Sequence, residues 1–383
     1  MFLPIEIYRN EIFKYLSVKD LYKVRIICKQ FKKIVDELLD DDKDRKRLIE
    51  SEIPQKILDS KFVKEMCQYD HSTLEKFKDL FIFSKNPAHK YFLSEDVDKD
   101  YLDFGSGPLA SLPKEIGILT QLTQLVLDQT NLRVFPKEIC NLSQLKELYL
   151  NGNSLTIFPE EIYRFTKLKH LDLSSNKLTC ISEDIKNLVS LERLHLGSNQ
   201  FTKFPKEICN LTQLKLLAFT NNQIDELPEE ISNLTKLTVL DFRSNRLTSL
   251  PRKFVNLTQL GQLDLGYNRF INIPEEIYQL FQLINLDLES NQITSLSEKI
   301  GNLIQLMSLS LDNNCLTSIP EEIKNLTLLR NLHLSYNQLT SLPEYFFGEF
   351  VLLFELGISN NRLTRRPKNI ATFLYSLENP FID

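Results

Sequence analysis

Two histidines and one carboxylate are the residues whose types and spacing come closest to a metal site in this chain. His170 and Asp172 alternate along one short apolar segment, and His195 follows Asp172 by 23 residues. Imidazole and carboxylate groups are ligands that zinc accepts, so side chains at this spacing form a candidate site if they project from adjacent strands. The simpler interpretation is that they are exposed polar residues of a binding surface. We favour the latter and expect no bound metal.

The sequence contains no motif that would support catalysis. A phosphate-binding loop of the form G-x-x-x-x-G-K-[ST], the zinc-protease motif H-E-x-x-H, the nucleophile motif G-x-S-x-G and a kinase-type H-R-D are all absent. We therefore expect a protein that is not an enzyme, with no catalytic residues and no cofactor.

Carboxylates also recur at a spacing of 23 residues. Asp241, Asp264 and Asp287 share this spacing, and Glu289 lies close by. On neighbouring parallel strands such side chains would lie about 5 Å apart, which is unfavourable unless a cation offsets their charges. One interpretation is that this column receives Lys and Arg side chains of a partner. The other is that Asp in the recurring L-D-L segment only supports the local turn.

These spacings arise because the chain repeats itself. Asn occurs at nine positions separated by 23 residues, from Asn153 to Asn337, and Asn361 follows after 24; Thr130 and Gly107 extend the phase backward to give twelve units. Each unit reads L-x-x-L-x-L-x-x-N-x-L and continues as L-P-x-E-I-x-N-L. The L-x-L core predicts a short strand with one buried face, and the Asn a turn whose backbone groups it binds. The segment that begins with Pro predicts a short helical or irregular stretch.

This unit resembles the leucine-rich repeat, in the 23-residue class of intracellular Ras-associated scaffolds. The resemblance covers about 270 residues and implies an α/β fold, a leucine-rich repeat solenoid with a curved parallel β-sheet on its concave side. We assign residues 101–370 to twelve repeats and residues 371–383 to a C-terminal cap or tail. A surface of this kind is expected to bind another protein.

The concave face is predicted from the alternation of side chains along each strand. Positions six, four and two before each Asn, or before Thr130 and Gly107 in the first two units, face away from the Leu columns. Ten of these 36 positions are acidic against two Arg. Leu216, Ala218 and Val239 form an apolar centre with Arg193, His195 and Arg243 at its rim, as in a binding hot spot; ordinary variation is the alternative. The predicted partner-binding residues are Asp172, Arg193, His195, Leu216, Ala218, Val239, Asp241, Arg243, Asp264, Asp287 and Glu289.

The first forty residues carry a different pattern, L-P-x-E-I followed by I-F-x-x-L, D-L, V and F, with apolar residues at helical spacing. It resembles the F-box, a small all-α module that binds the adaptor in Skp-cullin-F-box ubiquitin ligases. Phe31 stands where that family usually has Trp, and Val18 where Pro is common. The resemblance implies that the adaptor-binding residues are Leu3, Pro4, Ile7, Ile12, Leu16, Leu21, Val24 and Phe31.

The alternative is that these helices only cap the open end of the solenoid. Residues 41–100, a charged linker with a predicted helix, are the better cap, which leaves the F-box-like module at 1–40 available for a partner. Residues 1–35 carry a charge balance of +5 in a chain of net charge -5. The adaptor of this family is acidic, so the asymmetry favours docking.

Together these patterns predict a non-enzymatic receptor that holds a Skp-family adaptor, and through it a cullin ligase, at one end and a target protein on its concave face. The alternative is a ubiquitin-independent scaffold for a small GTPase or phosphatase. The acidic concave face argues against nucleic acid. The sequence has no signal peptide and no long apolar stretch, which predicts a cytoplasmic location, with the nucleus or a host cell as alternatives. We also expect no membrane partner.

Overall fold

A computed structural model of the protein describes residues 101–104, 112, 116–117, 119–343, 350 and 352–364. The F-box-like module, the linker and cap at 41–100 and the tail at 371–383 lie outside these residues. So do the predicted adaptor-binding side chains, Leu3, Pro4, Ile7, Ile12, Leu16, Leu21, Val24 and Phe31. The chain divides into two compact units, residues 1–148 and 149–383.

The L-x-L core of each repeat forms a strand of three residues, and the parallel strands follow the order of the sequence. The middle residue is a buried Leu in every strand, and in β2 to β12 its two neighbours lie on the opposite face, as the period of two requires. The strands are β1 (Tyr101–Asp103), β2 (Gln124–Val126), β3 (Glu147–Tyr149), β4 (His170–Asp172), β5 (Arg193–His195), β6 (Leu216–Ala218), β7 (Val239–Asp241), β8 (Gln262–Asp264), β9 (Asn285–Asp287), β10 (Ser308–Ser310), β11 (Asn331–His333) and β12 (Glu355–Gly357).

The P-x-E-I-x-N segments form short 3₁₀ helices, which confirms the expected short helical stretch. Pro precedes most of them in an extended conformation; Ser182 and Ser297 replace it twice, and there the hydroxyl accepts a hydrogen bond from the backbone N–H two residues on. The helices are η2 (Lys137–Asn141), η3 (Glu160–Arg164), η4 (Glu183–Asn187), η5 (Lys206–Asn210), η6 (Glu229–Asn233), η7 (Arg252–Asn256), η8 (Ile277–Gln279), η9 (Glu298–Asn302) and η10 (Glu321–Asn325).

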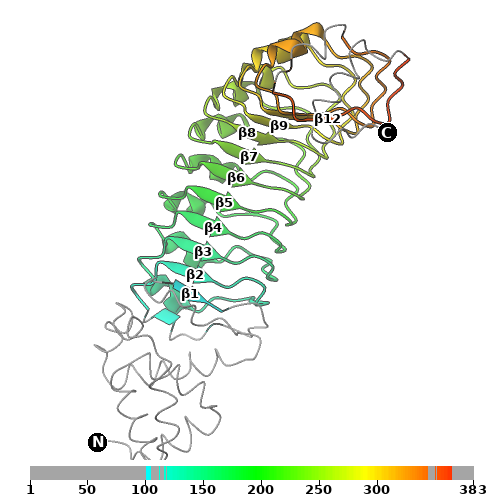
Figure 1. Ribbon diagram of the computed structural model, residues 1–383. Helices are drawn as coiled ribbons and strands as arrows, with labels where there is room; N and C mark the ends of the chain where they lie inside the picture. Colours follow the sequence, from blue (N-terminus) through cyan, green and yellow to red (C-terminus); the bar gives the residue numbers. More distant parts are fainter. Residues whose placement is uncertain are drawn as a thin grey trace, which may run out of the picture. The chain divides into compact units, whose positions relative to one another are not determined.

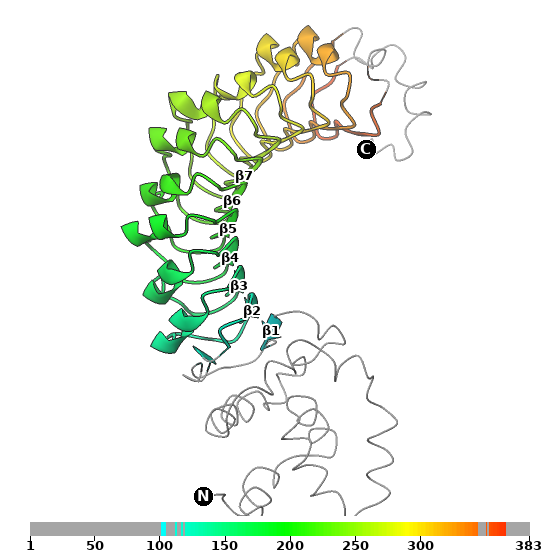
Figure 2. The same ribbon diagram turned by 90° about the vertical axis from the view of Figure 1, so that its left-hand side faces the viewer.

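In the unit formed by residues 149–383, strands β4 to β12 pair in a constant register in which Leu lies beside Leu. The strands line the inner side of an arc and the 3₁₀ helices its outer side (Figure 1, Figure 2). The predicted solenoid with a concave sheet is thereby confirmed. Among the described residues, no helix is both long and apolar enough to cross a membrane.

The repeated Asn ties each unit to the one before it. The Asn176 Nδ2 group donates to Leu173 O in its own unit at 3.0 Å and to Leu150 O in the preceding unit at 2.9 Å. The Asn176 Oδ1 atom accepts from Leu155 N at 3.0 Å. The side chain thus satisfies buried backbone groups that the short strands leave unpaired, which confirms its predicted structural role.

Candidate functional site

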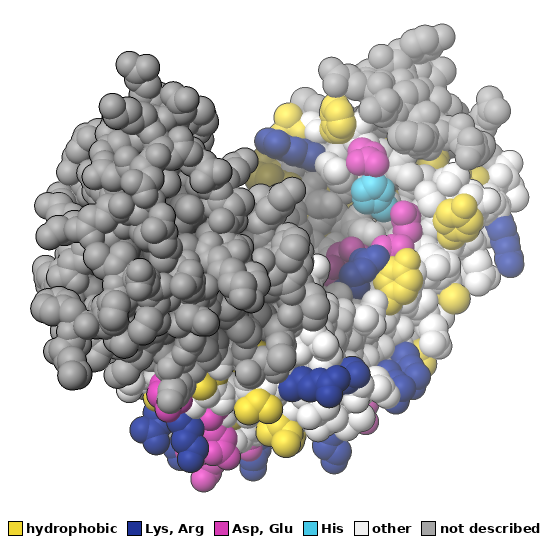
Figure 3. Space-filling model, turned by 90° about the horizontal axis from the view of Figure 1, so that it is seen from below, with side chains coloured by type: hydrophobic (Ala, Val, Ile, Leu, Met, Phe, Trp, Pro, Cys, Tyr) yellow, Lys and Arg dark blue, Asp and Glu magenta, His cyan; other side chains and the backbone are white. Residues whose placement is uncertain are grey.

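The predicted concave residues lie on, or two residues after, strands β4 to β9. Their side chains are half-buried or exposed, whereas the Leu residues between them are buried. The paired register places Asp172 beside His195, His195 beside Ala218, and Asp241 beside Asp264. Figure 3 shows acidic, basic, imidazole and hydrophobic side chains together in the hollow of the concave face. The structure therefore brings these residues onto one surface.

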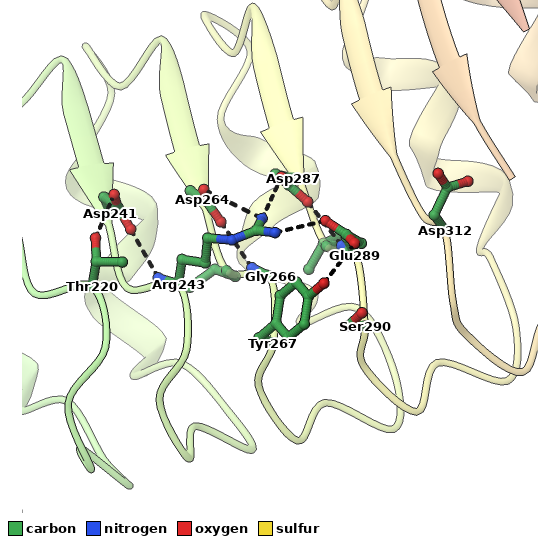
Figure 4. Close-up of polar contacts among 12 residues, drawn as sticks. Thr220, Asp241, Arg243, Asp264, Gly266, Tyr267, Asp287, Glu289, Ser290 and Asp312 are labelled. Atoms are coloured by element: carbon green, nitrogen blue, oxygen red, sulfur yellow. Dashed lines mark hydrogen bonds and ion pairs between the residues drawn. The ribbon is translucent and has the colours of Figure 1, made fainter. Parts of the chain in front are cut away.

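The acidic column contains its own cation. Asp241, Asp264 and Asp287 are register partners on β7, β8 and β9. The guanidinium of Arg243 extends across this column, and its Nη1 lies 3.0 Å from Asp287 Oδ2 while its Nη2 lies 2.7 Å from Glu289 Oε2 (Figure 4). A side chain of the same chain thus supplies a cation that offsets part of the negative charge of the column, and binding of a basic partner there stays a prediction.

A missing side chain allows Arg243 to cross β8. Gly266 lies at the position where Arg243 and Glu289 lie in the neighbouring units, and a Cβ atom there would be 2.9 Å from Arg243 Nη1. Tyr267 supports the guanidinium from the other side: its ring centroid lies 4.4 Å from Arg243 Cζ, and its hydroxyl donates to Glu289 Oε1 at 3.0 Å. The arginine is therefore held in place by a cation–π contact as well as by ion pairs.

Each aspartate of the column also supports its local turn. Asp241 Oδ1 accepts from Arg243 N at 2.9 Å, Asp264 Oδ1 from Gly266 N at 2.9 Å, and Asp287 Oδ1 from Glu289 N at 2.8 Å. These contacts agree with the turn interpretation of the L-D-L segment. The second oxygen of Asp241 also accepts from the Thr220 hydroxyl at 2.7 Å, and that of Asp287 pairs with Arg243 at 3.0 Å.

The burial of Asp264 raises the pKa of its carboxyl to about 7, and the charges of Asp287 and Asp241 add to this effect. The N–H of Gly266 and the guanidinium of Arg243 act in the opposite direction. The effect of burial on the pKa is larger than both. Arg243 Nη1 lies 3.9 Å from Asp264 Oδ2, farther than the 3.0 Å that separates it from Asp287 Oδ2. Asp264 is consequently the member of the column that is readily protonated near neutral pH.

This elevated pKa predicts that Asp264 lowers stability as pH rises. An unfolded Asp titrates near pH ~4, so between that pH and about 7 the folded state binds the extra proton and loses stability as the pH increases. The Asp264→Asn variant should lose this component, and its stability relative to wild type should be higher at pH 8 than at pH 5. Urea unfolding at both values measures this. The exposed Asp225→Asn control should keep the wild-type pH dependence, and an unaltered dependence in Asp264→Asn would contradict the assignment.

The histidines form an aromatic contact at the other end of the concave face. The rings of His170 and His195 lie 5.3 Å apart between centroids, and the Tyr149 hydroxyl lies 3.3 Å from His170 Nδ1. Asp172 Oδ1 accepts from Ser174 N at 2.8 Å. Within the described ranges, no group of three His, Cys, Asp or Glu side chains is arranged to hold a metal ion. The residues that suggested a metal site are engaged in ring and turn contacts.

The apolar centre lies where the sequence places it, but its rim differs. Leu216, Ala218 and Val239 are neighbours on β6 and β7, and all three are half-buried. Arg193 is exposed beside Leu216. Arg243, expected at this rim, is instead committed to the carboxylates around β8 and β9. Sequence reasoning also missed Gly266 and Tyr267, although Gly at a position occupied by long side chains in both neighbouring units was a detectable signal.

Comparisons with known families match both predicted regions. The family described as leucine-rich repeat region matches residues 99–203 and 202–290, and a further leucine-rich repeat family matches 281–339 and 304–363. The F-box domain matches residues 9–42. Leu3, Pro4 and Ile7 precede that match, and the part of all eight residues in adaptor binding stays a prediction. A comparison with curated proteins gives no significant match.

Solved structures with the same fold include a leucine-rich repeat protein of Leptospira interrogans, 39% identical, with a TM-score of 0.69 and coverage of 72% of this chain and 70% of the other. An internalin of Listeria monocytogenes is 27% identical, with a TM-score of 0.59 and coverage of 68% and 73%. The ectodomain of an Arabidopsis thaliana receptor kinase is 28% identical, with a TM-score of 0.54 and coverage of 73% and 44%. The chain therefore belongs to the leucine-rich repeat proteins and carries an F-box domain in its N-terminal part.

Proposed function

We propose that the protein is a non-enzymatic substrate receptor of a Skp-cullin-F-box type ubiquitin ligase. The observation that carries this proposal is the presence, in one chain, of an F-box match at residues 9–42 and a repeat region with an accessible concave face. Both kinds of domain are protein-interaction modules. In this proposal the F-box binds a Skp-family adaptor, the repeats bind the target, and partner enzymes transfer ubiquitin.

The adaptor end of the proposed assembly is the basic segment of the chain. Its charge balance of +5 over residues 1–35 complements an acidic adaptor and would speed their encounter. The matched residues proposed to contact the adaptor are Ile12, Leu16, Leu21, Val24 and Phe31. This assembly places the protein in the cytoplasm or the nucleus.

The target end is the concave face of β4 to β9. Its mixture of half-buried apolar, imidazole and charged side chains gives a pattern that a partner can match at several points. The Arabidopsis ectodomain with this fold is solved in complex with Casparian strip integrity factor 2, which supports recognition of a partner by such repeats. We propose that Asp172, Arg193, His195, Leu216, Ala218, Val239, Asp241, Arg243, Asp264, Asp287 and Glu289 contribute to target binding.

A turnover experiment tests the complete function. Cells express either the intact chain or a full-length Leu16→Ala, Leu21→Ala, Val24→Ala variant, and proteins that co-purify with both forms are identified. Their half-lives are then measured by pulse-chase. A target should bind both forms but have a shorter half-life only with the intact chain. Equal half-lives of every shared partner would contradict the receptor function and favour the scaffold that binds a GTPase or phosphatase.

A further inference from the structure

A group of basic side chains borders the concave face at the N-terminal ends of β4 to β7. It lies in the six residues that precede each of these strands, namely 164–169, 187–192, 210–215 and 233–238. These segments contain five basic residues and one acidic residue, in a chain that is acidic overall. Arg164 ends η3 on the outer side of the arc, so it is left out. We call the remaining group the basic edge; its members are Lys167, Lys169, Lys215 and Lys236, with Glu192 as the acidic residue.

Backbone hydrogen bonds link the residues directly before β4 to β7 into one continuous row. Glu192 N donates to Lys169 O at 2.8 Å, Lys215 N to Glu192 O at 2.8 Å, and Thr238 N to Lys215 O at 2.9 Å. A second row is linked by Lys236, whose Nζ donates to Gln213 Oε1 at 2.6 Å. Side chains from four successive units therefore gather on one side of the solenoid, directly before the first residue of each strand.

The single carboxylate of the basic edge is shared between two lysines. Lys169 Nζ lies 3.0 Å from Glu192 Oε1, and Lys215 Nζ lies 2.7 Å from Glu192 Oε2. These lysines lower the pKa of Glu192 to about 2, so it stays ionised at physiological pH. One negative charge faces two positive charges, and both lysine side chains remain more than half exposed, at 56% and 54%. The edge keeps an excess of positive charge that is accessible to a partner.

The basic edge is continuous with the apolar centre of the concave face. Arg193 follows Glu192 in the chain, is exposed, and forms no ion pair with any residue that the structure describes. Its register partner on β6 is Leu216, which in turn lies beside Val239. A partner that crosses this boundary therefore meets positive charge first and an apolar surface next.

We propose that the basic edge and the adjoining residues of β5 to β7 bind a segment of the target in which carboxylates alternate with apolar side chains. This inference rests on the proposed function, because it concerns the same target. It differs from the initial expectation of a basic target: Arg243 already partly neutralises the acidic column, whereas the positive charge of the edge remains in excess.

Two observations favour an acidic polypeptide over a nucleic acid and restrict its position. The concave surface beside the edge carries Asp172 and Asp241, which would repel phosphates, and the apolar Leu216 and Val239, which offer phosphates nothing. The equivalent segments before β8, β9 and β10, residues 256–261, 279–284 and 302–307, contain no charged residue. The run of charged residues therefore ends at β7 on this side, and single basic residues recur at Lys146 before β3 and Arg330 before β11.

Fluorescence anisotropy with the full chain tests the inference. The probe is a labelled, end-blocked peptide of about ten residues in which Glu alternates with Leu, long enough to cross four units. Two matched peptides carry Ser or Lys in place of Glu. We expect the Glu peptide to bind most tightly and to lose affinity as salt increases. Equal binding of all three peptides, or preference for the Lys peptide, would overturn the proposal.

Four variants locate the contact. Lys169→Gln with Lys215→Gln should lower the affinity for the Glu peptide about fivefold or more. Glu192→Gln should raise that affinity about twofold, a gain that a misfolded protein could not produce. The control pair Lys206→Gln with Lys324→Gln removes the same charge from exposed sites on η5 and η10 and should leave affinity unchanged. Leu216→Ser should weaken peptide binding. No difference between the edge and control pairs would overturn the assignment.

Three further outcomes distinguish failure of this inference from failure of the proposed ligase function. Tight binding of a labelled oligouridine that depends on Lys169 and Lys215 but not on Leu216 would assign the edge to nucleic acid and overturn the proposal. A chain that binds the Glu peptide as expected but no Skp-family adaptor would support this inference and contradict the ligase function. A chain that binds the adaptor but shows no preference among peptides would do the reverse.

Discussion

Replacing Asn245 by alanine is expected to lower the free energy of unfolding by about 3 kcal/mol or more, because several buried backbone groups lose their partners. The Asn245 Nδ2 group donates to Phe219 O at 2.9 Å, Phe242 O at 3.1 Å and Arg243 O at 3.3 Å, and its Oδ1 accepts from Ile224 N at 3.0 Å. The side chain is only 7% exposed, so water cannot replace these contacts without opening the repeat.

Two other variants calibrate this expectation. Asn245→Thr should cost less, because the natural Thr130 at the equivalent position donates to Leu127 O at 2.9 Å and so keeps one of the bonds. Asn233→Ala, an exposed Asn at the end of η6, should change stability by less than about 0.5 kcal/mol. Guanidinium unfolding measures all three. If Asn245→Ala were as stable as Asn233→Ala, the role assigned to the repeated Asn would be wrong.

The loss should affect target binding as well as stability. In a solenoid each unit contacts only its neighbours, so a weakened unit interrupts the stack at its own position. Asn245 binds the carbonyl of Arg243, the residue that crosses the acidic column. Damage at this unit therefore falls between the apolar centre and the carboxylates of β8 and β9.

The strands and turns of the repeat region could be predicted because they depend on residues that recur at a fixed period. The Leu columns define the buried face of each strand, and the Asn positions define where each unit turns. The Ser residues at 182 and 297, which interrupt the Pro pattern, cap their helices with a hydroxyl instead. Local sequence determines each of these features, so no distant contact is needed to find them.

The geometry of the acidic column could not be predicted in the same way. Arg243 has a long side chain, and the direction of that side chain depends on two residues of the next unit. Gly266 leaves space for it, and Tyr267 provides a ring surface against which it packs. The periodic pattern treats concave positions as equivalent and therefore placed Arg243 at the rim of the apolar centre. The direction of a flexible side chain follows from its neighbours in space, which the repeat does not specify.

The basic edge was missed for a different reason. The alternation of side chains along a strand identifies only the three concave positions of each unit, and the basic edge lies just before them. A count of charges in the six residues that precede each strand would have found it, because Arg164, Lys167 and Lys169 fall within one such segment. The charges of the basic edge are therefore visible in the sequence, but the predicted binding surface did not include the residues that precede each strand.

Loss of adaptor binding is the second large effect that we expect. The F-box match covers residues 9–42, and its apolar residues at helical spacing include Leu16, Leu21 and Val24. Truncating all three to alanine should weaken adaptor binding by at least about a hundredfold, because buried apolar anchors contribute most of the energy of such interfaces. Asn10→Ala with Gln30→Ala, polar positions outside the pattern, is the matched control. Circular dichroism must show unchanged helix content in both variants.

The most direct measurement is calorimetric titration of the intact chain with a purified Skp-family adaptor. We expect a stoichiometric complex that is retained by the Asn10→Ala, Gln30→Ala control and lost in the Leu16→Ala, Leu21→Ala, Val24→Ala variant. A separate Leu3→Ala, Pro4→Ala variant would show whether residues before the F-box match also contact the adaptor. No binding by the intact chain, or undiminished binding by the folded triple variant, would contradict the claim that this protein links a target to a ubiquitin ligase.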